Sequence, residues 1–284
     1  MKKILSVLMC VMMIVAMMPA MAMAETVVEE AATAEELQAA FNAGGAVKLT
    51  KNIVVALSET GKAFEIAADK EVVLDLNGCA ISVTSTYAGA TSVIAVYGNL
   101  TILDNGEEGT IALTEALEDP TFGYATDTIY NEGTLTINGG TIINNCSGAS
   151  YAVDTNCGGK TIINAGKVYA SDSKAVRAYS WSEDTASTLV ITGGHLEGTN
   201  AVYLHNLGSN SANKISATIT GGTFVSNSSS DIKMALYSLC NNGGNVDINI
   251  NGGTFNGDVV FGGYYEFATY VPPLISKDRS DGLT

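Results

Sequence analysis

Basic residues are scarce in this chain of 284 residues. It carries 14 Lys and Arg against 29 Asp and Glu, a formal net charge of −15. A field of this sign repels nucleic acids and acidic polymers. We therefore expect no nucleic-acid partner, whereas a small local site for an acidic sugar is compatible with the charge.

Long apolar runs are absent except at the N-terminus. Lys2 and Lys3 precede an apolar stretch over residues 4–18, and small residues follow up to Ala24. This order is typical of a secretory signal peptide, and the stretch is shorter than the roughly 20 residues of a membrane-spanning helix. We expect residues 1–24 to be a signal peptide, leaving a secreted or surface-displayed chain with no membrane span.

Histidine and cysteine are too few or too dispersed to predict a metal site. The two histidines, His195 and His205, fall on different predicted strands with no evident third ligand. Four cysteines remain after the signal peptide, and Cys146 with Cys157 is the one pairing close enough to consider as a disulfide. Buried thiols that pack as small apolar side chains are the favoured interpretation.

A recurring turn motif, Ile-Asn or Ile-Thr followed by glycines, dominates the sequence. Its final glycine recurs in steps of 26, 28, 28 and 31 residues, a period typical of solenoids and other stacked-unit folds. These glycines are Gly140, Gly166, Gly194, Gly222 and Gly253. Each motif is preceded by alternating apolar residues, which predict half-buried strands.

The repeat predicts an all-β protein, a single-stranded parallel β-helix of about seven coils over residues 46–263. Thr33 and Glu36 form a capping-box signature, so residues 25–45 are expected to hold a short helix that caps the first coil. Residues 264–284 lack the repeat and are expected to form an irregular tail.

Three segments carry a family resemblance: Ala46–Leu49, Val73–Gly78 and Asn131–Ile137. They resemble the right-handed β-helix regions of bacterial secreted and cell-surface proteins, in the broad pectate-lyase-like fold group. The resemblance implies a right-handed coil. It also implies a range of functions, from polysaccharide lyases and glycoside hydrolases to adhesins and modules without known activity, among which fold alone cannot choose.

An Ala-apolar-Tyr pattern recurs in the repeats and predicts a column of outward side chains on successive coils. By alternation, the apolar residue points inward and its neighbours point outward. The column comprises Tyr97, Tyr130, Asp154, Arg177, Tyr203 and Tyr237. Tyr179 and His205 occupy the next outward position, and Trp181 lies beyond.

We expect this face to bind a ligand, because Tyr and Trp combine apolar faces with polar tips suited to sugars or protein partners. The segments flanking these strands also vary in length between repeats, and variable loops on a regular scaffold often bind. A glycan is the first candidate partner and a surface protein the second, for a monomeric protein without a cofactor. The candidate ligand-binding residues are Arg177, Tyr179, Trp181, Tyr203, His205 and Tyr237.

Two alternatives stay open. In a polysaccharide lyase or hydrolase, Arg177 and Asp154 would be the catalytic candidates, and only then would calcium be expected. The sequence lacks an Asp-Asp pair, a Gly-His-Gly motif and a calcium-binding glycine repeat, which argues against catalysis. In a purely structural rod, the tyrosine column would serve cross-strand packing alone.

Overall fold

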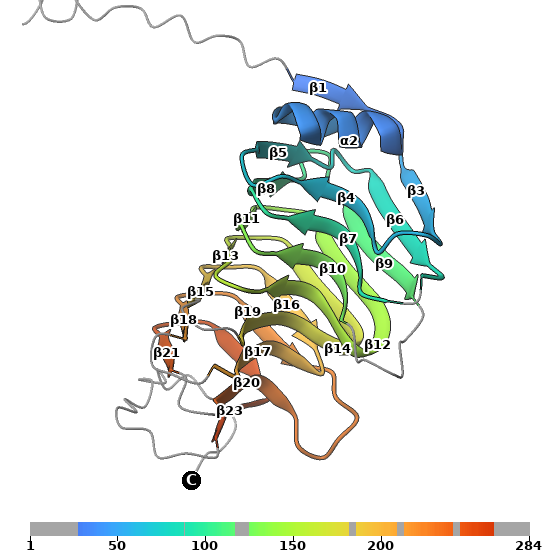
Figure 1. Cartoon of the computed structure of the whole chain (residues 1–284). Helices are drawn as coiled ribbons and strands as arrows, with labels where there is room; N and C mark the ends of the chain where they lie inside the picture. Colours follow the sequence, from blue (N-terminus) through green and yellow to red (C-terminus); the bar gives the residue numbers. More distant parts are fainter. Residues whose placement is uncertain are drawn as a thin grey trace, which may run out of the picture.

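The computed structural model describes residues 28–87, 89–116, 125–181, 186–208, 213–240 and 245–263. The chain winds into a parallel β-solenoid of about seven turns, as the repeat predicted (Figure 1). The described residues hold one helix, at the N-terminal end of the stack. The predicted signal peptide and the predicted C-terminal tail lie outside the described residues.

The solenoid has three faces, and a full turn contributes one strand to each of them. The first face is a nine-stranded parallel sheet that runs the length of the stack. Its strands in order are β1 (Val28–Ala31), β2 (Gly45–Leu49), β5 (Glu71–Asp75), β8 (Asn99–Leu103), β11 (Thr134–Ile137), β13 (Lys160–Ile163), β15 (Ala186–Ile191), β18 (Lys214–Ile219) and β21 (Asn245–Ile250).

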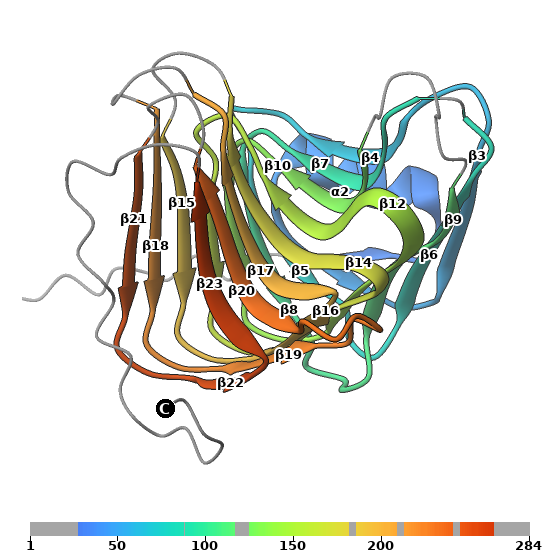
Figure 2. The ribbon, with the colours of Figure 1, turned by 90° about the horizontal axis from the view of Figure 1, so that it is seen from below.

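The second face shares two long strands with the third. Figure 2 shows these strands, β12 (Thr141–Thr155) and β14 (Lys167–Ser180), curving from one face into the next. The other strands of the second face are β3 (Ile53–Leu57), β6 (Ala80–Ser85), β9 (Thr110–Ala116), β16 (His195–Gly198), β19 (Thr223–Ser226) and β22 (Thr254–Asn256).

The third face carries most of the predicted site. Residues 144–150, one of the segments whose length varies between repeats, lie within β12, where the register shifts twice. Besides the second halves of β12 and β14, this face contains β4 (Lys62–Ile66), β7 (Thr91–Val96), β10 (Thr126–Asn131), β17 (Asn200–Asn206), β20 (Met234–Cys240) and β23 (Asp258–Gly263).

Equivalent apolar residues of successive coils stack into the core. On the third face, Ile94, Ile129 and Val153 are paired in register, and all three are fully buried. Each such side chain contributes roughly 1.5–3 kcal/mol when removed from water. The corresponding column on the first face is also fully buried and consists of Leu74, Ile102, Ile137, Ile163, Ile191 and Ile219.

The predicted cap helix is present as α2 (Ala34–Ala43). Thr33 and Glu36 form the capping box, since the Thr33 side chain accepts from the Glu36 backbone N–H and the Glu36 carboxylate accepts from that of Thr33. Leu37 and Phe41 are fully buried against the first coils. The sequence reading missed strand β1, which precedes the helix and pairs with β2.

Strict alternation fails in five strands of the third face, namely β10, β12, β14, β17 and β20. Thr128 and Ile129 are consecutive, yet both are fully buried, and Ala152 with Val153 behaves in the same way. The prediction that the alanine before the central apolar residue points outward was therefore wrong for Ala152, Ala175, Ala201 and Ala235, which belong to the core. It holds for Ala95, which lines the outer pocket described below. The irregularity brings the residue before each pair onto the outer surface, and it shapes the candidate site described below.

Candidate functional site

The outer surface of the third face is organised in rows along the solenoid axis. Its central row is the predicted column, with Tyr130, Asp154, Arg177, Tyr203 and Tyr237 in register on five strands. Tyr97 does not belong to this row. Ala95 pairs with Tyr130, so Tyr97 stands one outward position further along its strand, although its ring still packs edge-on against Tyr130 at 6.4 Å.

Arg177 is the most strongly held side chain of this surface. Its Nε donates to Asp154 Oδ1 at 2.7 Å and its Nη2 to Asp154 Oδ2 at 2.6 Å. The guanidinium also lies 3.8 Å from the ring centre of Tyr151 and 4.4 Å from that of Tyr179. Arg177 is thereby only 8% exposed, although the sequence pattern suggested an open, ligand-facing position.

The ion pair fixes the charge of Arg177. Burial alone would lower the pKa of Arg177, but the attraction of the Asp154 carboxylate outweighs it, so the pKa is raised. A guanidinium with a raised pKa cannot take up a proton as a general base. The geometry therefore argues against the lyase role considered for Arg177.

The predicted aromatic residues form a ladder across β14, β17 and β20. The rings of Tyr203 and Tyr237 are nearly parallel, 5.6 Å apart. His205 lies 5.0 Å from Tyr203 and 5.2 Å from Tyr179, between the two rings. Because neighbouring rings cover one another's faces, the ladder presents ring edges and polar tips to solvent rather than open ring faces.

His205 and Tyr203 carry no charge at neutral pH. Burial, with a further effect of the Arg177 charge, lowers the pKa of His205 to about 4. Burial likewise raises the pKa of Tyr203. The ladder therefore offers neutral hydrogen-bonding groups around a charge that Asp154 already balances.

Trp181 stands apart from the ladder as the exposed aromatic of this surface. Its side chain is 56% exposed. The indole Nε1–H points back to the preceding coil and donates to Cys157 Sγ at 3.1 Å. The indole is thus both open to solvent and held in place.

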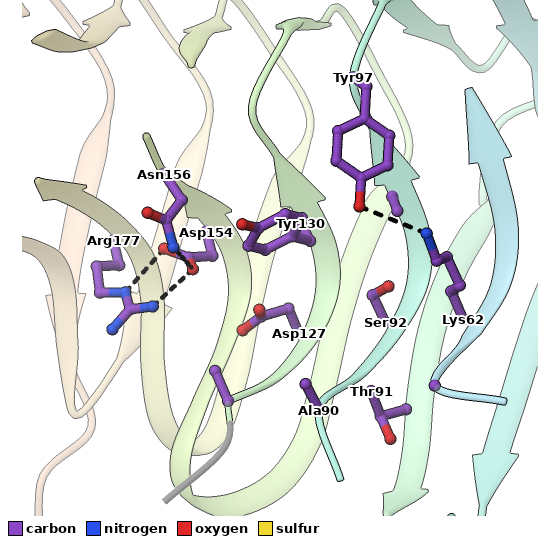
Figure 3. Close-up of a pocket in the computed structure, with 13 residues that line it drawn as sticks. Lys62, Ala90, Thr91, Ser92, Tyr97, Asp127, Tyr130, Asp154, Asn156 and Arg177 are labelled. Atoms are coloured by element: carbon purple, nitrogen blue, oxygen red, sulfur yellow. Dashed lines mark hydrogen bonds and ion pairs between the residues drawn. The ribbon is translucent and has the colours of Figure 1, made fainter. Parts of the chain in front are cut away.

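A pocket of about 300 Å³ opens on the same face, on the N-terminal side of the Asp154–Arg177 pair (Figure 3). Small residues of β7 and the preceding segments leave the space, since Ala95 and Ser92 stand where later coils carry larger side chains. Its polar lining consists of Lys62, Thr91, Ser92, Tyr97, Asp127, Tyr130, Asp154, Asn156 and Arg177.

Asp127 is the unusual member of this lining. It is only 3% exposed, and its Oδ1 has no hydrogen-bond partner among the residues the structure describes. Burial, reinforced by the Asp154 carboxylate and opposed by Arg177, raises the pKa of Asp127 well above its usual value. Asp127 is therefore held towards its neutral form.

Sequence reasoning missed Asp127 for a physical reason. Asp127 and Tyr130 are three residues apart, so strict alternation places them on opposite sides of the sheet. The consecutive buried pair Thr128 and Ile129 breaks that alternation. As a result, the side chains of Asp127 and Tyr130 line the same pocket. The signal in the sequence was the repeated pair of a small and an apolar residue. Alternation predicts that one residue of this pair points inward, but both do.

The described residues show neither a metal centre nor a membrane-spanning helix. No group of three or more His, Cys, Asp or Glu residues could hold a metal ion within the described ranges. Over the same ranges, no helix is long and apolar enough to cross a membrane. Of the four cysteines in the described ranges, Cys146 and Cys240 are buried, whereas Cys79 and Cys157 are partly exposed.

Fold and surface together define a parallel β-solenoid with one outer face built from aromatic and ion-paired side chains. Comparison with protein-family models, curated proteins and solved structures finds no match. The function must therefore be argued from the surface itself.

Proposed function

We propose that this protein is a secreted or cell-surface binding module that recognises glycans through the outer side of its third face. The N-terminal signal-peptide pattern supports export. The resemblance to right-handed β-helix regions of bacterial surface proteins supports the same setting. The contact residues in this proposal are Arg177, Tyr179, Trp181, Tyr203, His205 and Tyr237.

The exposed indole of Trp181 carries the proposal. A purely structural rod accounts for the Tyr203–Tyr237 ladder, because stacked rings stabilise adjacent strands without any ligand. It does not account for a tryptophan that is 56% exposed and yet anchored through its Nε1–H to Cys157. Trp combines a large apolar face with a polar edge, and such residues dominate the energetics of binding surfaces.

The ladder determines what kind of contact a sugar would make. Tyr203 and Tyr237 each have one ring face covered by the other, whereas Trp181 is 56% exposed, so we assign stacking on a sugar ring to Trp181. The phenol hydroxyls and the neutral imidazole of His205 supply donors and acceptors for sugar hydroxyls. We therefore expect one stacking contact surrounded by hydrogen bonds.

A glycan array probed with the mature chain, residues 25–284, tests this proposal. We expect saturable binding that Trp181→Ala weakens at least about tenfold, about 1.4 kcal/mol. Val54→Ala is the matched control, because Val54 is 77% exposed on the second face and its loss should change nothing.

Three outcomes would contradict the proposal. Binding that persists unchanged in Trp181→Ala would move the site elsewhere on the molecule. No saturable binding to any glycan would leave the aromatic ladder as packing and favour a protein ligand or a structural rod. New reducing or unsaturated ends released from a bound glycan would instead indicate an enzyme.

A further inference from the structure

The pocket beside the ladder contains a buried acid that its surroundings leave incomplete. Asp127 Oδ1 is buried without a hydrogen-bond partner among the described residues, and Asp127 lines the pocket together with Tyr130 from its own strand (Figure 3). An unsatisfied buried polar atom costs roughly 1–3 kcal/mol. Such a cost at the wall of a pocket is accounted for if a ligand supplies the missing partner.

The charges around the pocket indicate the charge of that ligand. Lys62 Nζ pairs with Glu65 at 2.5 Å, and Arg177 pairs with Asp154 at 2.6 Å. Asp127 is the remaining lining carboxyl group, and it forms no ion pair with another of the described residues. If ionised, it would leave the pocket one positive charge short.

The walls suit a small cation. Tyr97 and Tyr130 line the pocket, and aromatic faces attract cations. The Lys62 ammonium already lies 5.1 Å from the ring centre of Tyr97, so Tyr130 is the lining ring that is left for a cationic ligand. The remaining lining includes Gly61, which has no side chain, and Ala95, whose side chain is a single methyl group, and both leave room for a compact ligand. At about 300 Å³, the pocket is at the lower end of small-molecule sites.

We propose that this pocket binds a small molecule through a primary ammonium group, which donates a hydrogen bond to the Asp127 carboxylate. A hydroxyl could donate to Oδ1 but would bring no charge, so the charge count favours the ammonium. The proposal does not rest on glycan binding by Trp181, because that residue does not line the pocket.

Binding would be coupled to the release of a proton. Without ligand, burial and the neighbouring Asp154 hold Asp127 towards its neutral form, while Arg177 opposes them. Of the other titratable groups around the pocket, Tyr130 and Tyr151 have raised pKa values and stay neutral. The hydrogen bond to Glu65 raises the pKa of Lys62, which stays charged. An arriving ammonium favours the carboxylate, so the Asp127 proton leaves to solvent and the amine keeps its own.

Titration calorimetry on the mature chain tests the proposal. The probes are ethylammonium, ethanolammonium and glucosamine, each paired with an uncharged counterpart: ethanol, ethylene glycol and glucose. We expect at least one amine to bind and its counterpart not to bind. Repeating the titration in buffers of different ionisation enthalpy should show net proton release at neutral pH, up to about one proton per ligand.

Asp127→Asn is the decisive variant, because it keeps the shape of the side chain and removes the charge. We expect it to weaken amine binding at least about tenfold and to abolish proton release. Asp172→Asn is the matched control, since Asp172 is an exposed carboxylate on β14 that does not line the pocket. Trp181→Ala should leave amine binding intact, which separates this site from the proposed glycan surface.

Three results would overturn the proposal. One is that none of the amines binds, with circular dichroism confirming the β-rich fold. Another is equal binding of an amine and its uncharged counterpart, which would indicate a hydroxyl-binding pocket. The third is unchanged amine affinity in Asp127→Asn.

Discussion

At the scale of single residues, the third face shows how burial changes the meaning of a side chain. Asp154 and Asp127 lie on adjacent strands, but Asp154 is closed by two hydrogen bonds from Arg177 whereas Asp127 has an unpartnered oxygen. Removing one member of a buried ion pair costs about 3–5 kcal/mol. The Arg177–Asp154 ion pair therefore stabilises the fold. Asp127 is the residue whose missing hydrogen bond a ligand would supply.

Asp127 also makes a prediction about stability and pH. Its pKa is raised in the folded state above the unfolded value of 3.8. Between the two values the folded protein binds more protons, so the contribution of Asp127 to stability is lost as pH rises from about 4 through the folded pKa. Asp127→Asn has no such loss.

Urea denaturation of the wild-type protein and of Asp127→Asn, from pH 4 to pH 9, measures this effect. The stability of the wild type relative to the variant should fall with increasing pH. A difference that is independent of pH would show that Asp127 does not titrate on unfolding, and a difference that changes in the opposite direction would mean that its carboxylate is stabilised by the fold.

At the scale of elements, the turn glycines decide how closely coils approach. Gly166 has a φ of +85°, and a Cβ there would lie 2.6 Å from the carbonyl oxygen of Gly140 on the previous coil. Gly158 has a similar φ of +91°, but a Cβ would meet nothing within 4 Å. The two positions therefore separate backbone strain from crowding between coils.

Alanine substitutions at these two glycines should differ in cost. Gly158→Ala carries the strain of the left-handed conformation alone, about 1–2 kcal/mol. Gly166→Ala adds the overpacking of two coils, about 1–3 kcal/mol more. Chemical denaturation of both variants checks the order, and equal costs would mean that the coils shift apart without penalty.

The bend in the third-face strands acts at the same scale. Two consecutive buried residues, such as Thr128 and Ile129, move the residue before them to the outer surface. The row that results pairs Ser92 with Asp127 and Asp127 with Tyr151. A pocket arises where this row begins with small side chains and continues with larger ones.

At the scale of the whole molecule, stability should be distributed along the stack. Each coil packs mainly against its neighbours, so a solenoid behaves approximately as a chain of nearest-neighbour interactions. Phe41 of the cap helix is fully buried and packs edge-on against Phe64, with ring centres 6.1 Å apart. Near the other end, Phe224 is equally buried and stacks on Phe255 at 4.5 Å.

Phe41→Ala and Phe224→Ala should therefore loosen opposite ends of the molecule. Each truncation costs about 3–5 kcal/mol locally. Hydrogen-exchange mass spectrometry should show faster exchange in β2, β4 and β5 for Phe41→Ala, and in β16, β19 and β22 for Phe224→Ala. Uniformly faster exchange in both variants would show that the stack unfolds as a single cooperative unit.

The sequence by itself determined the architecture. Glycine turns at a near-constant spacing and apolar residues with a period of two are local signals, and each coil of the stack repeats them. The solenoid could therefore be predicted from the sequence, and so could the capping box at Thr33 and Glu36. It also determined which side chains share the central row from Tyr130 to Tyr237.

Only the tertiary structure decided the character of the site. The burial of Arg177 depends on rings from β12 and β14, and the exposure of Asp127 to the pocket depends on a broken alternation at Thr128 and Ile129. These features arise from contacts between coils and from local bends, which a period-2 reading of one strand does not contain. The same contacts turned predicted ligand-facing tyrosines into a ladder whose faces cover each other, and left Trp181 exposed.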